Sequence, residues 1–280
     1  MMVDRFSWIR SALFLPASNA RAIEKARSLP CDMVILDLED AVRDADKDAA
    51  RVAAVEAVSA GGFGGRPVAI RLNGPGTLWH EGDVAAVRAS GAALAVLPKM
   101  EDADEAAGIA AAIVKPVLAM IETPAGVLAA AAIARAPGVD GLIAGTNDLA
   151  AGLRLPAGGE GRAGLALALQ TIVLAARAAD GLALDGVWNR LDDPHGLEAE
   201  CREGRAYGFD GKTLIHPNQI AIANRAFAPG EAELDDARAL VAAATGGAER
   251  FRGRMIEAMH VEAARRLLAI AGTAGGGEGT

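Results

Sequence analysis

The stretch VLAMIETPAGVLAAAAIAR, residues 117–135, contains the repeating unit from which the fold can be predicted. Its first part, Val117–Ile121, is short and apolar throughout, which is typical of a strand buried on both faces. Thr123 suits a helix N-cap, with Pro124 as the first helical residue. Gly126–Arg135 then has the composition and length of a helix. One β-strand followed by one α-helix is therefore expected here.

The same unit repeats along the chain. Short apolar runs occur at Ala12–Leu15, Met33–Leu38, Val68–Leu72, Leu94–Pro98, Val117–Ile121, Gly141–Ala144, Leu182–Val187 and Lys212–Ile215. Segments with helical periodicity separate them, at Ala20–Ser28, Lys47–Ser59, Glu81–Arg88, Ala103–Ile113, Gly126–Arg135, Leu165–Ala179, Gly196–Tyr207 and Asn218–Phe227. Eight such β-then-α units predict an α/β protein with a (β/α)8 TIM barrel, and an open doubly wound sheet is the alternative.

A C-terminal helical extension is expected after the barrel. Pro229-Gly230 ends the repeat, and Glu231–Thr245 and His260–Ile270 are predicted to be helices. The second helix has an apolar stripe that needs cover from the barrel or from a neighbouring subunit; it comprises Val261, Ala264, Leu267 and Leu268. The prediction is a barrel domain over residues 1–228, an extension over 229–270 and a glycine-rich, disordered tail over 271–280.

Composition and charge exclude several classes of partner. The 280 residues include 28 basic and 36 acidic side chains, a net charge of −8, with no long basic run, which argues against a nucleic-acid surface. No apolar run is long enough to cross a membrane, and Met1–Arg10 lacks the apolar segment of a signal peptide. We expect a cytoplasmic protein with a small-molecule substrate. Cys31 and Cys201 are too few for a disulfide scaffold, and the scattered histidines do not predict a zinc site.

Polar residues gather where the predicted strands end. These residues are Glu39, Asp40, Arg71, Asn73, Lys99, Glu122, Asp148 and His216. In a TIM barrel the carboxyl ends of the strands and the loops that follow them form the active face. The sequence therefore predicts a site at this end of the barrel.

Glu122 and Asp148 follow consecutive predicted strands, so their carboxylates are expected to converge. A buried acid needs a cation, and two carboxylates with water and substrate oxygens are typical of Mg²⁺, with Mn²⁺ as a substitute. The alternative is that each acid caps a helix. Because Thr123 already suits the cap, the metal interpretation is favoured for Glu122.

Three acids, Asp37, Glu39 and Asp40, lie within the run MVILDLED. Their mutual repulsion calls for cations, and Lys47, Arg51 and Arg71 are the candidates. Glu39 and Asp40 are predicted to hold water molecules of the metal ion, and an ordinary solvated turn is the alternative.

Arg71 ends a buried strand, where a guanidinium is costly unless it meets an anion. Its planar fork fits a substrate carboxylate or an enolate oxygen, and an ion pair with Glu39 is the alternative. Lys212 invites comparison with aldolases that form a Schiff base. It begins its strand, however, and is expected to face the other end of the barrel.

Seven motifs taken together give the chain a family resemblance. They are RSALFL (10–15), DLEDAV (37–42) with Lys47 and Arg51, RLN (71–73), LPK (97–99), IETP with Glu122, GTNDL with Asp148, and GKTLIHPNQI (211–220). In this order they resemble the citrate lyase beta-subunit-like proteins of the HpcH/HpaI aldolase family, within the pyruvate/phosphoenolpyruvate barrel superfamily.

The resemblance implies a magnesium-dependent lyase that breaks or makes a carbon–carbon bond beside a thioester. The expected reaction converts a malyl-, citramalyl- or citryl-CoA type of 3-hydroxyacyl thioester into an acyl thioester and a 2-oxo acid. Glu122 and Asp148 would bind Mg²⁺, Arg71 and Glu122 would contact substrate, and Arg71 would support oxyanion charge. A homo-oligomer, a trimer or a multiple of it, is also expected.

Three positions depart from the family pattern. Relatives place an aspartate base in a G-x-M-[VI]-D stretch that a neighbouring subunit often delivers, and here residues 253–257 read GRMIE, so Glu257 is the candidate base. Ala17 stands where glycine is common, which puts binding of coenzyme A in doubt. Arg43 stands where proline is common.

Two other functions remain open at this stage. One is an aldolase that acts on free 2-oxo acids without a thioester. The other is an accessory role, as the beta component of a larger lyase that receives its substrate on an acyl-carrier partner.

Overall fold

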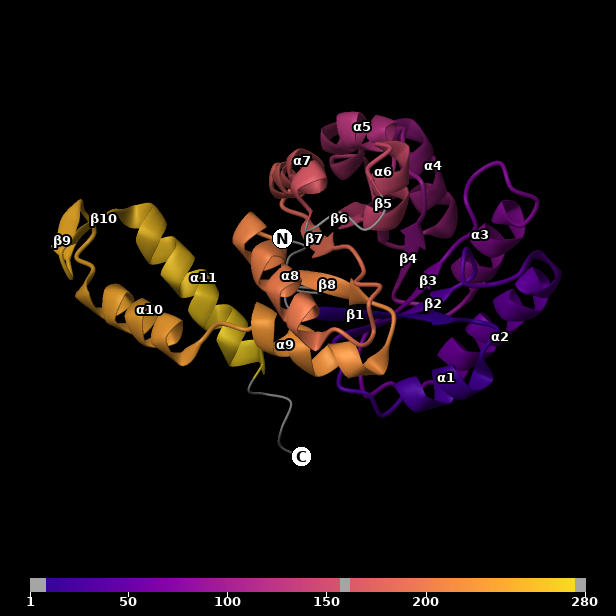
Figure 1. The fold of residues 1–280 in the computed structure, drawn as a ribbon, viewed down its shortest axis with the longest axis horizontal. Coiled ribbons are helices and arrows are strands. Elements are labelled where there is room, and N and C mark those ends of the chain that lie inside the picture. The colour runs from indigo at the N-terminus through magenta and orange to yellow at the C-terminus, as the bar shows by residue number, and fades with distance from the viewer. Residues whose placement is uncertain (1–8, 157–161, 275–280) are drawn as a thin grey trace. The chain divides into compact units, whose positions relative to one another are not determined.

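The computed structural model describes residues 9–156 and 162–274. These residues fall into two compact units divided between Arg225 and Ala226, close to the predicted end of the barrel domain at residue 228. In the first unit, eight parallel strands close into a barrel in the order of the sequence, and helices surround it (Figure 1). The predicted TIM barrel is confirmed and the open sheet is excluded.

The strands of the barrel are short. They are β1 (Ser11–Pro16), β2 (Met33–Asp37), β3 (Val68–Arg71), β4 (Leu94–Leu97), β5 (Val117–Ile121), β6 (Val139–Ala144), β7 (Leu182–Asp185) and β8 (Gly211–Leu214). The helices around them are α1 (Ala20–Ala26), α2 (Lys47–Ala60), α3 (His80–Ala89), α4 (Ala103–Ile113), α5 (Pro124–Ala134), α6 (Thr146–Gly152), α7 (Ala166–Arg177), α8 (Pro194–Tyr207) and α9 (Ile220–Phe227). Three 3₁₀ turns complete the unit, η1 (Asp44–Asp46), η2 (Ala163–Leu165) and η3 (Pro217–Gln219).

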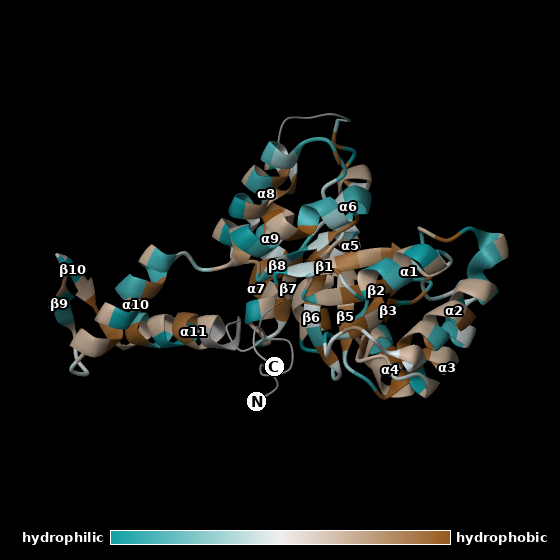
Figure 2. Cartoon of the chain, turned by 90° about the horizontal axis from the view of Figure 1, so that it is seen from below, coloured by the Kyte–Doolittle hydropathy of each residue, from teal (hydrophilic) through white to brown (hydrophobic). Residues whose placement is uncertain are grey.

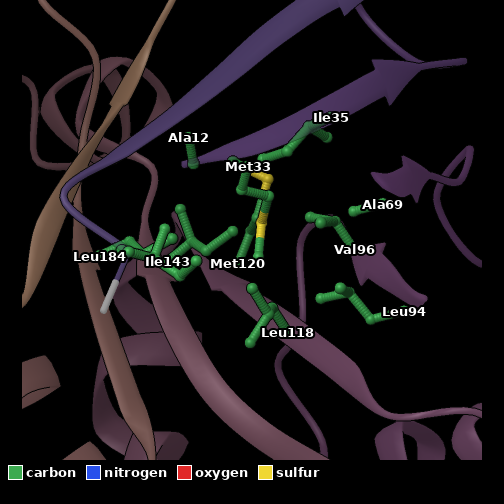
Figure 3. Close-up of a cluster of buried hydrophobic side chains, with 11 residues drawn as sticks. Ala12, Met33, Ile35, Ala69, Leu94, Val96, Leu118, Met120, Ile143 and Leu184 are labelled. Carbon is green, nitrogen blue, oxygen red and sulfur yellow. The ribbon is translucent and has the colours of Figure 1, made fainter. Parts of the chain in front are cut away.

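Alternation along the strands builds the interior of the barrel. Residues two apart face the same side of a sheet, so Met33 and Ile35 of β2 point inward, together with Leu118 and Met120 of β5. Figure 3 shows these side chains meeting others from the neighbouring strands in one buried apolar cluster. In Figure 2 the strands are largely hydrophobic, while the surrounding helices carry hydrophilic residues. The same alternation brings the next inward position of β2, Asp37, to the mouth of the barrel.

Local sequence decides where several helices begin. Thr123 accepts a hydrogen bond from the Gly126 N–H, with Pro124 at the start of α5, as the sequence predicts. Asp193 does the same for α8, where it accepts from the Gly196 N–H. Such caps satisfy N–H groups that have no partner inside the helix.

Three parts of the chain differ from the predicted elements. The seven-residue helix α6, which begins two residues after β6, was not predicted. A small hairpin, β9 (Glu249–Phe251) and β10 (Arg254–Ile256), was also missed. Both are too short to show a clear period in sequence. Helix α11 (Ala258–Ala274) continues to Ala274, into the stretch expected to be disordered; residues 275–280 lie outside the described part.

The second unit contains α10 (Glu231–Ala243), the β9–β10 hairpin and α11. Its small core joins the three elements and comprises Ala237, Leu240, Ile256 and Ala264, with Val241, Phe251, Val261, Leu267 and Leu268 packed against it. The apolar stripe of α11 is therefore covered by α10 and the hairpin of its own unit. Among the described residues, no helix has both the length and the apolar character needed to span a bilayer.

Candidate active site

A cavity of about 410 Å³ opens at the carboxyl ends of the barrel strands. Predicted site residues from four separate segments of the chain line it, namely Asp40, Arg71, Glu122 and Asp148. Apolar side chains form part of the same wall, including Phe14 and Met120. The fold thus brings polar side chains from distant parts of the sequence into one cavity, as expected for the active face of a TIM barrel.

Arg71 and Asp37 form a buried ion pair beside this cavity. They are register partners on β3 and β2 and both point inward. Arg71 donates from Nε and Nη2 to the two carboxylate oxygens of Asp37, each at 2.7 Å. Its guanidinium also lies over the Phe14 ring, 4.9 Å from the centroid. Burial alone would lower the pKa of Arg71, but the charge of Asp37 and then of Glu39 outweighs it and raises that pKa.

Glu39 is buried between two cations. Lys99 donates from Nζ to one carboxylate oxygen at 2.6 Å, and Nη1 of Arg71 lies 2.9 Å from the other. The alternative raised for Arg71, an ion pair with Glu39, is therefore present together with its position in the cavity. Burial still raises the pKa of Glu39 despite both cations. Its predicted role of holding metal-bound water stays a prediction.

Of the three cations expected from the sequence, Arg71 pairs with Asp37 and Glu39, whereas Lys47 and Arg51 have other partners. Lys47 donates instead to the backbone carbonyls of Leu38 and Glu39, and Arg51 pairs with Asp48 and Asp83. Their proximity in the chain to DLEDAV suggested pairing with its carboxylates, but Lys47 bonds the backbone of the turn and Arg51 bonds acids outside it. Lys99, which was not among the expected cations, pairs with Glu39 beside Arg71.

Glu122 projects from the end of β5 and is 3% exposed. The backbone N–H of Lys99 donates to its Oε1 at 2.7 Å. Gly145 leaves the room that the side chain needs, since a Cβ at residue 145 would lie 2.5 Å from Glu122 Oε2. Burial and the charge of Glu39 raise the pKa of Glu122 to about 7, and the charge of Asp148 adds to this effect.

Asp148 lies in the first turn of α6, not at the end of a strand as predicted. Strand β6 ends at Ala144, and the turn between the two elements carries the residue to the rim of the cavity. Its side chain is 45% exposed and lies 3.9 Å from Lys99 Nζ. The neighbouring Asn147 exchanges two amide hydrogen bonds with Asn189 on the β7–α8 loop, which joins α6 to the loop after the adjacent strand.

The remaining polar residues of the sequence have other surroundings. Asn73 donates to buried Asp83, which holds the loop after β3. His216 accepts a hydrogen bond from the Asn218 N–H at the start of η3. Glu257 lies in the second unit, exposed, just before α11. Ala17 is buried and donates its N–H to the Asp37 carbonyl, and Arg43 is exposed beside Asp46.

The sequence suggested that Lys212 faces the far end of the barrel, and this prediction is wrong. Lys212 is fully buried and points outward into the helix layer, where it pairs with Asp185 at 3.2 Å and Glu200 at 2.7 Å. One step of strand alternation separates it from Thr213, which faces the cavity. Because Lys212 has no access to the cavity, the Schiff-base interpretation has no structural support.

The side chains at the mouth fit a magnesium ion. Glu122 and Asp148 line one cavity. The charges of Glu39 and Asp148 disfavour ionised Glu122, and a divalent cation would offset that repulsion. Within residues 9–156 and 162–274, no group of three or more His, Cys, Asp or Glu side chains is arranged to bind a metal. The protein would therefore supply two oxygen ligands at most from such a pair, which suits Mg²⁺ better than zinc.

Comparison with known proteins identifies the family. A family model described as HpcH/HpaI aldolase/citrate lyase matches residues 10–217. The chain belongs to this family. A second model, described as a C-C bond lyase of the TIM-barrel fold, matches residues 165–275. The resemblance inferred from the seven motifs is confirmed.

Relatives cover nearly the whole chain. The (3S)-malyl-CoA thioesterase of Cereibacter sphaeroides is 41% identical over 269 residues, 94% of each chain. Citrate lyase subunit beta of Leuconostoc mesenteroides is 32% identical over 94% of this chain and 93% of its own. The structure of CitE from Mycobacterium tuberculosis in complex with magnesium, acetoacetate and coenzyme A is similar with a TM-score of 0.81 and 34% identity, covering 95% of this chain and 99% of that one.

The raised pKa of Glu122 predicts a specific pH dependence of stability. A carboxyl with a higher pKa in the folded than in the unfolded state stabilises the folded protein. This stabilisation is complete below the unfolded-state pKa and is lost as the pH rises through the folded-state value of about 7. Between about pH 5 and pH 8, in chelator, the wild type should lose about 2–3 kcal/mol of unfolding free energy relative to Glu122→Gln. Urea unfolding measures this difference, with Glu56→Gln on the exposed face of α2 as control. Parallel pH profiles for wild type and Glu122→Gln would contradict the prediction.

Proposed function

We propose that this protein is a Mg²⁺-dependent carbon–carbon lyase acting on a 3-hydroxyacyl thioester of the malyl-, citramalyl- or citryl-CoA type. The products are an acyl thioester and a 2-oxo acid. The observation that carries the proposal is the lining of one barrel-mouth cavity by Glu122, Asp148 and Arg71. Two relatives support the substrate class, since one is named for malyl-CoA and one was solved with magnesium and coenzyme A.

In this proposal Glu122 and Asp148 hold the magnesium ion. When bound, the ion supplies Lewis acidity to the carboxylate and adjacent oxygen of the oxo or hydroxy acid. Arg71 supports negative charge that develops on oxygen, from a side chain already fixed by Asp37. Asp40, whose side chain is 60% exposed beside the cavity, is proposed to accept hydrogen bonds from water near the ion, and Glu39 to assist it.

Cleavage requires a base for the 3-hydroxyl proton. As the base takes this proton, the carbinol becomes a carbonyl and the C2–C3 bond breaks. The electron pair passes to the thioester as an enolate, which then gains a proton at C2. We assign the base to Glu257 of a neighbouring subunit in a cytoplasmic homotrimer, since a carboxylate stands at this position and its side chain is exposed.

A second reaction, hydrolysis of the thioester, is favoured by one observation. The relative with 41% identity is named a (3S)-malyl-CoA thioesterase. Hydrolysis would use the same magnesium and the same bound thioester, but water would attack the thioester carbonyl and release free coenzyme A with the hydroxy acid. The two reactions therefore differ in their products and not in their binding site.

Replacement of Asp148 tests the proposed metal site. Asp148→Asn retains the shape of the side chain but loses the charge, so Mg²⁺ affinity measured by calorimetry should fall by about 100-fold or more. The melting temperature should stay the same, because the side chain lies at a solvent-exposed rim. Asp180→Asn, in the loop before β7, is the control. An unchanged Mg²⁺ affinity in Asp148→Asn would rule out this ligand.

A panel of malyl-, citramalyl- and citryl-CoA, assayed with Mg²⁺ or with chelator, tests the reaction. The lyase proposal expects acyl-CoA and a 2-oxo acid, with turnover lost in chelator. Free thiol and hydroxy acid, without oxo acid, would establish hydrolysis in its place. Turnover that persists in chelator would eliminate both magnesium mechanisms. Activity on free oxo acids alone would leave an aldolase that needs no thioester.

Mixed oligomers test the origin of the base. Glu257→Gln and Asp148→Asn should each be inactive alone. If a neighbouring subunit supplies Glu257, co-expression of the two variants with different tags should restore about a quarter of the wild-type sites, those that combine an intact Asp148 with an intact partner Glu257. No recovery in purified mixed oligomers would show that each chain uses its own Glu257, or none.

A further inference from the structure

Lys99 contacts four carboxylates near the proposed metal. It follows β4 with a backbone φ of 53°, a conformation that side-chain-bearing residues seldom adopt. Its N–H holds Glu122. Its ammonium lies 2.6 Å from Glu39, 3.7 Å from Asp40 and 3.9 Å from Asp148. The unusual backbone lets one residue serve Glu122 with its main chain and the other acids with its side chain.

The ammonium and a divalent ion would share the same negative charge. Glu122 and Asp148 are the proposed ligands, and Lys99 Nζ already forms ion pairs with Asp148 and with the nearby Glu39 and Asp40. An ion bound to Asp148 would approach the ammonium closely. The metal ion and the ammonium would repel each other strongly at such a distance, because water is partly excluded from between them. Metal binding and the present place of the Lys99 side chain therefore oppose each other.

The ammonium has a place to go. Lys99 lines a second cavity of about 490 Å³, which adjoins the barrel mouth because Asp40 lines both. Asp44 and Glu105 also line this second cavity. The Lys99 side chain is 43% exposed, and its flexible stem allows the charged end to turn toward these acids without movement of the backbone.

We propose that Lys99 is an internal competitor of the metal ion, which sets the divalent-cation affinity of the site and turns into the Asp44–Glu105 cavity when the metal binds. The inference rests on the proposed function, in that it takes Glu122 and Asp148 as the metal ligands. In this role Lys99 positions the acids and lowers the affinity of the site for the metal ion, and it does not contact substrate. The functional consequence is that the bound metal ion exchanges readily with the solution.

The test measures Mn²⁺ affinity by electron paramagnetic resonance, with Mg²⁺ as competitor, in wild type, Lys99→Met, Lys99→Gln and Lys99→Arg. The neutral variants retain the N–H that holds Glu122 but lose the charge, so they should bind Mn²⁺ about tenfold more tightly. Lys99→Arg retains the charge and should bind within about twofold of wild type. Lys115→Met, before β5 at the opposite end of the barrel, controls for loss of a lysine and should bind like the wild type.

Unchanged or weaker Mn²⁺ binding in both neutral variants would overturn the inference while the metal site itself stands. Absence of any Asp148-dependent Mn²⁺ binding in the wild type would remove the proposed function, and the inference with it. Melting temperatures in chelator provide a second readout. In chelator the neutral variants should have a lower melting temperature than the wild type, and added Mg²⁺ should raise it by more. Loss of a lysine with a purely structural role would instead lower the melting temperature equally with and without Mg²⁺.

Discussion

The bidentate pair between Arg71 and Asp37 is the interaction on which the mouth of the barrel depends. Below it the interior is apolar, so either charge alone would be strongly destabilising. Asp37 also accepts hydrogen bonds from the Glu39 and Ala41 N–H groups. The oxygens that fix the guanidinium therefore fix the turn after β2, which presents Glu39 and Asp40. One ion pair connects the core to the polar layer above it.

Charge balance explains why the layer above this pair favours a cation. Arg71 is engaged by Asp37 and Glu39, and Lys99 by Glu39 and the rim acids, so negative charge remains in excess near Glu122. The pKa of Glu122 is raised to about 7 as a result of burial first and of neighbouring acids next. Since the ionised form of Glu122 is disfavoured in this site, the site is suited to a positively charged ligand that stabilises that form. Both candidate reactions, cleavage and hydrolysis, can use that same arrangement.

Much of the fold, and several of the residues that line the cavity, could be predicted from local sequence. Eight apolar runs separated by helical segments specify the barrel, since runs that short, apolar on both sides, are stable only when helices cover them. Thr123 and Pro124 start α5 through contacts within one turn. The strand ends also indicate which polar residues share the cavity, because parallel strands point their carboxyl ends the same way. Arg71, Glu122 and Asp40 are found there for that reason.

Partners among these residues were decided by the tertiary structure alone. Lys99 reaches Glu39 across 60 residues of chain, whereas Lys47, eight residues from Glu39, bonds backbone instead. One position of strand alternation sends Lys212 into the helix layer, and an unpredicted turn of helix carries Asp148. Sequence determines which elements form, since that rests on local hydrogen bonding and apolar periodicity. Ion pairing depends on distances of a few ångströms between separate strands and loops, which only closure of the barrel establishes.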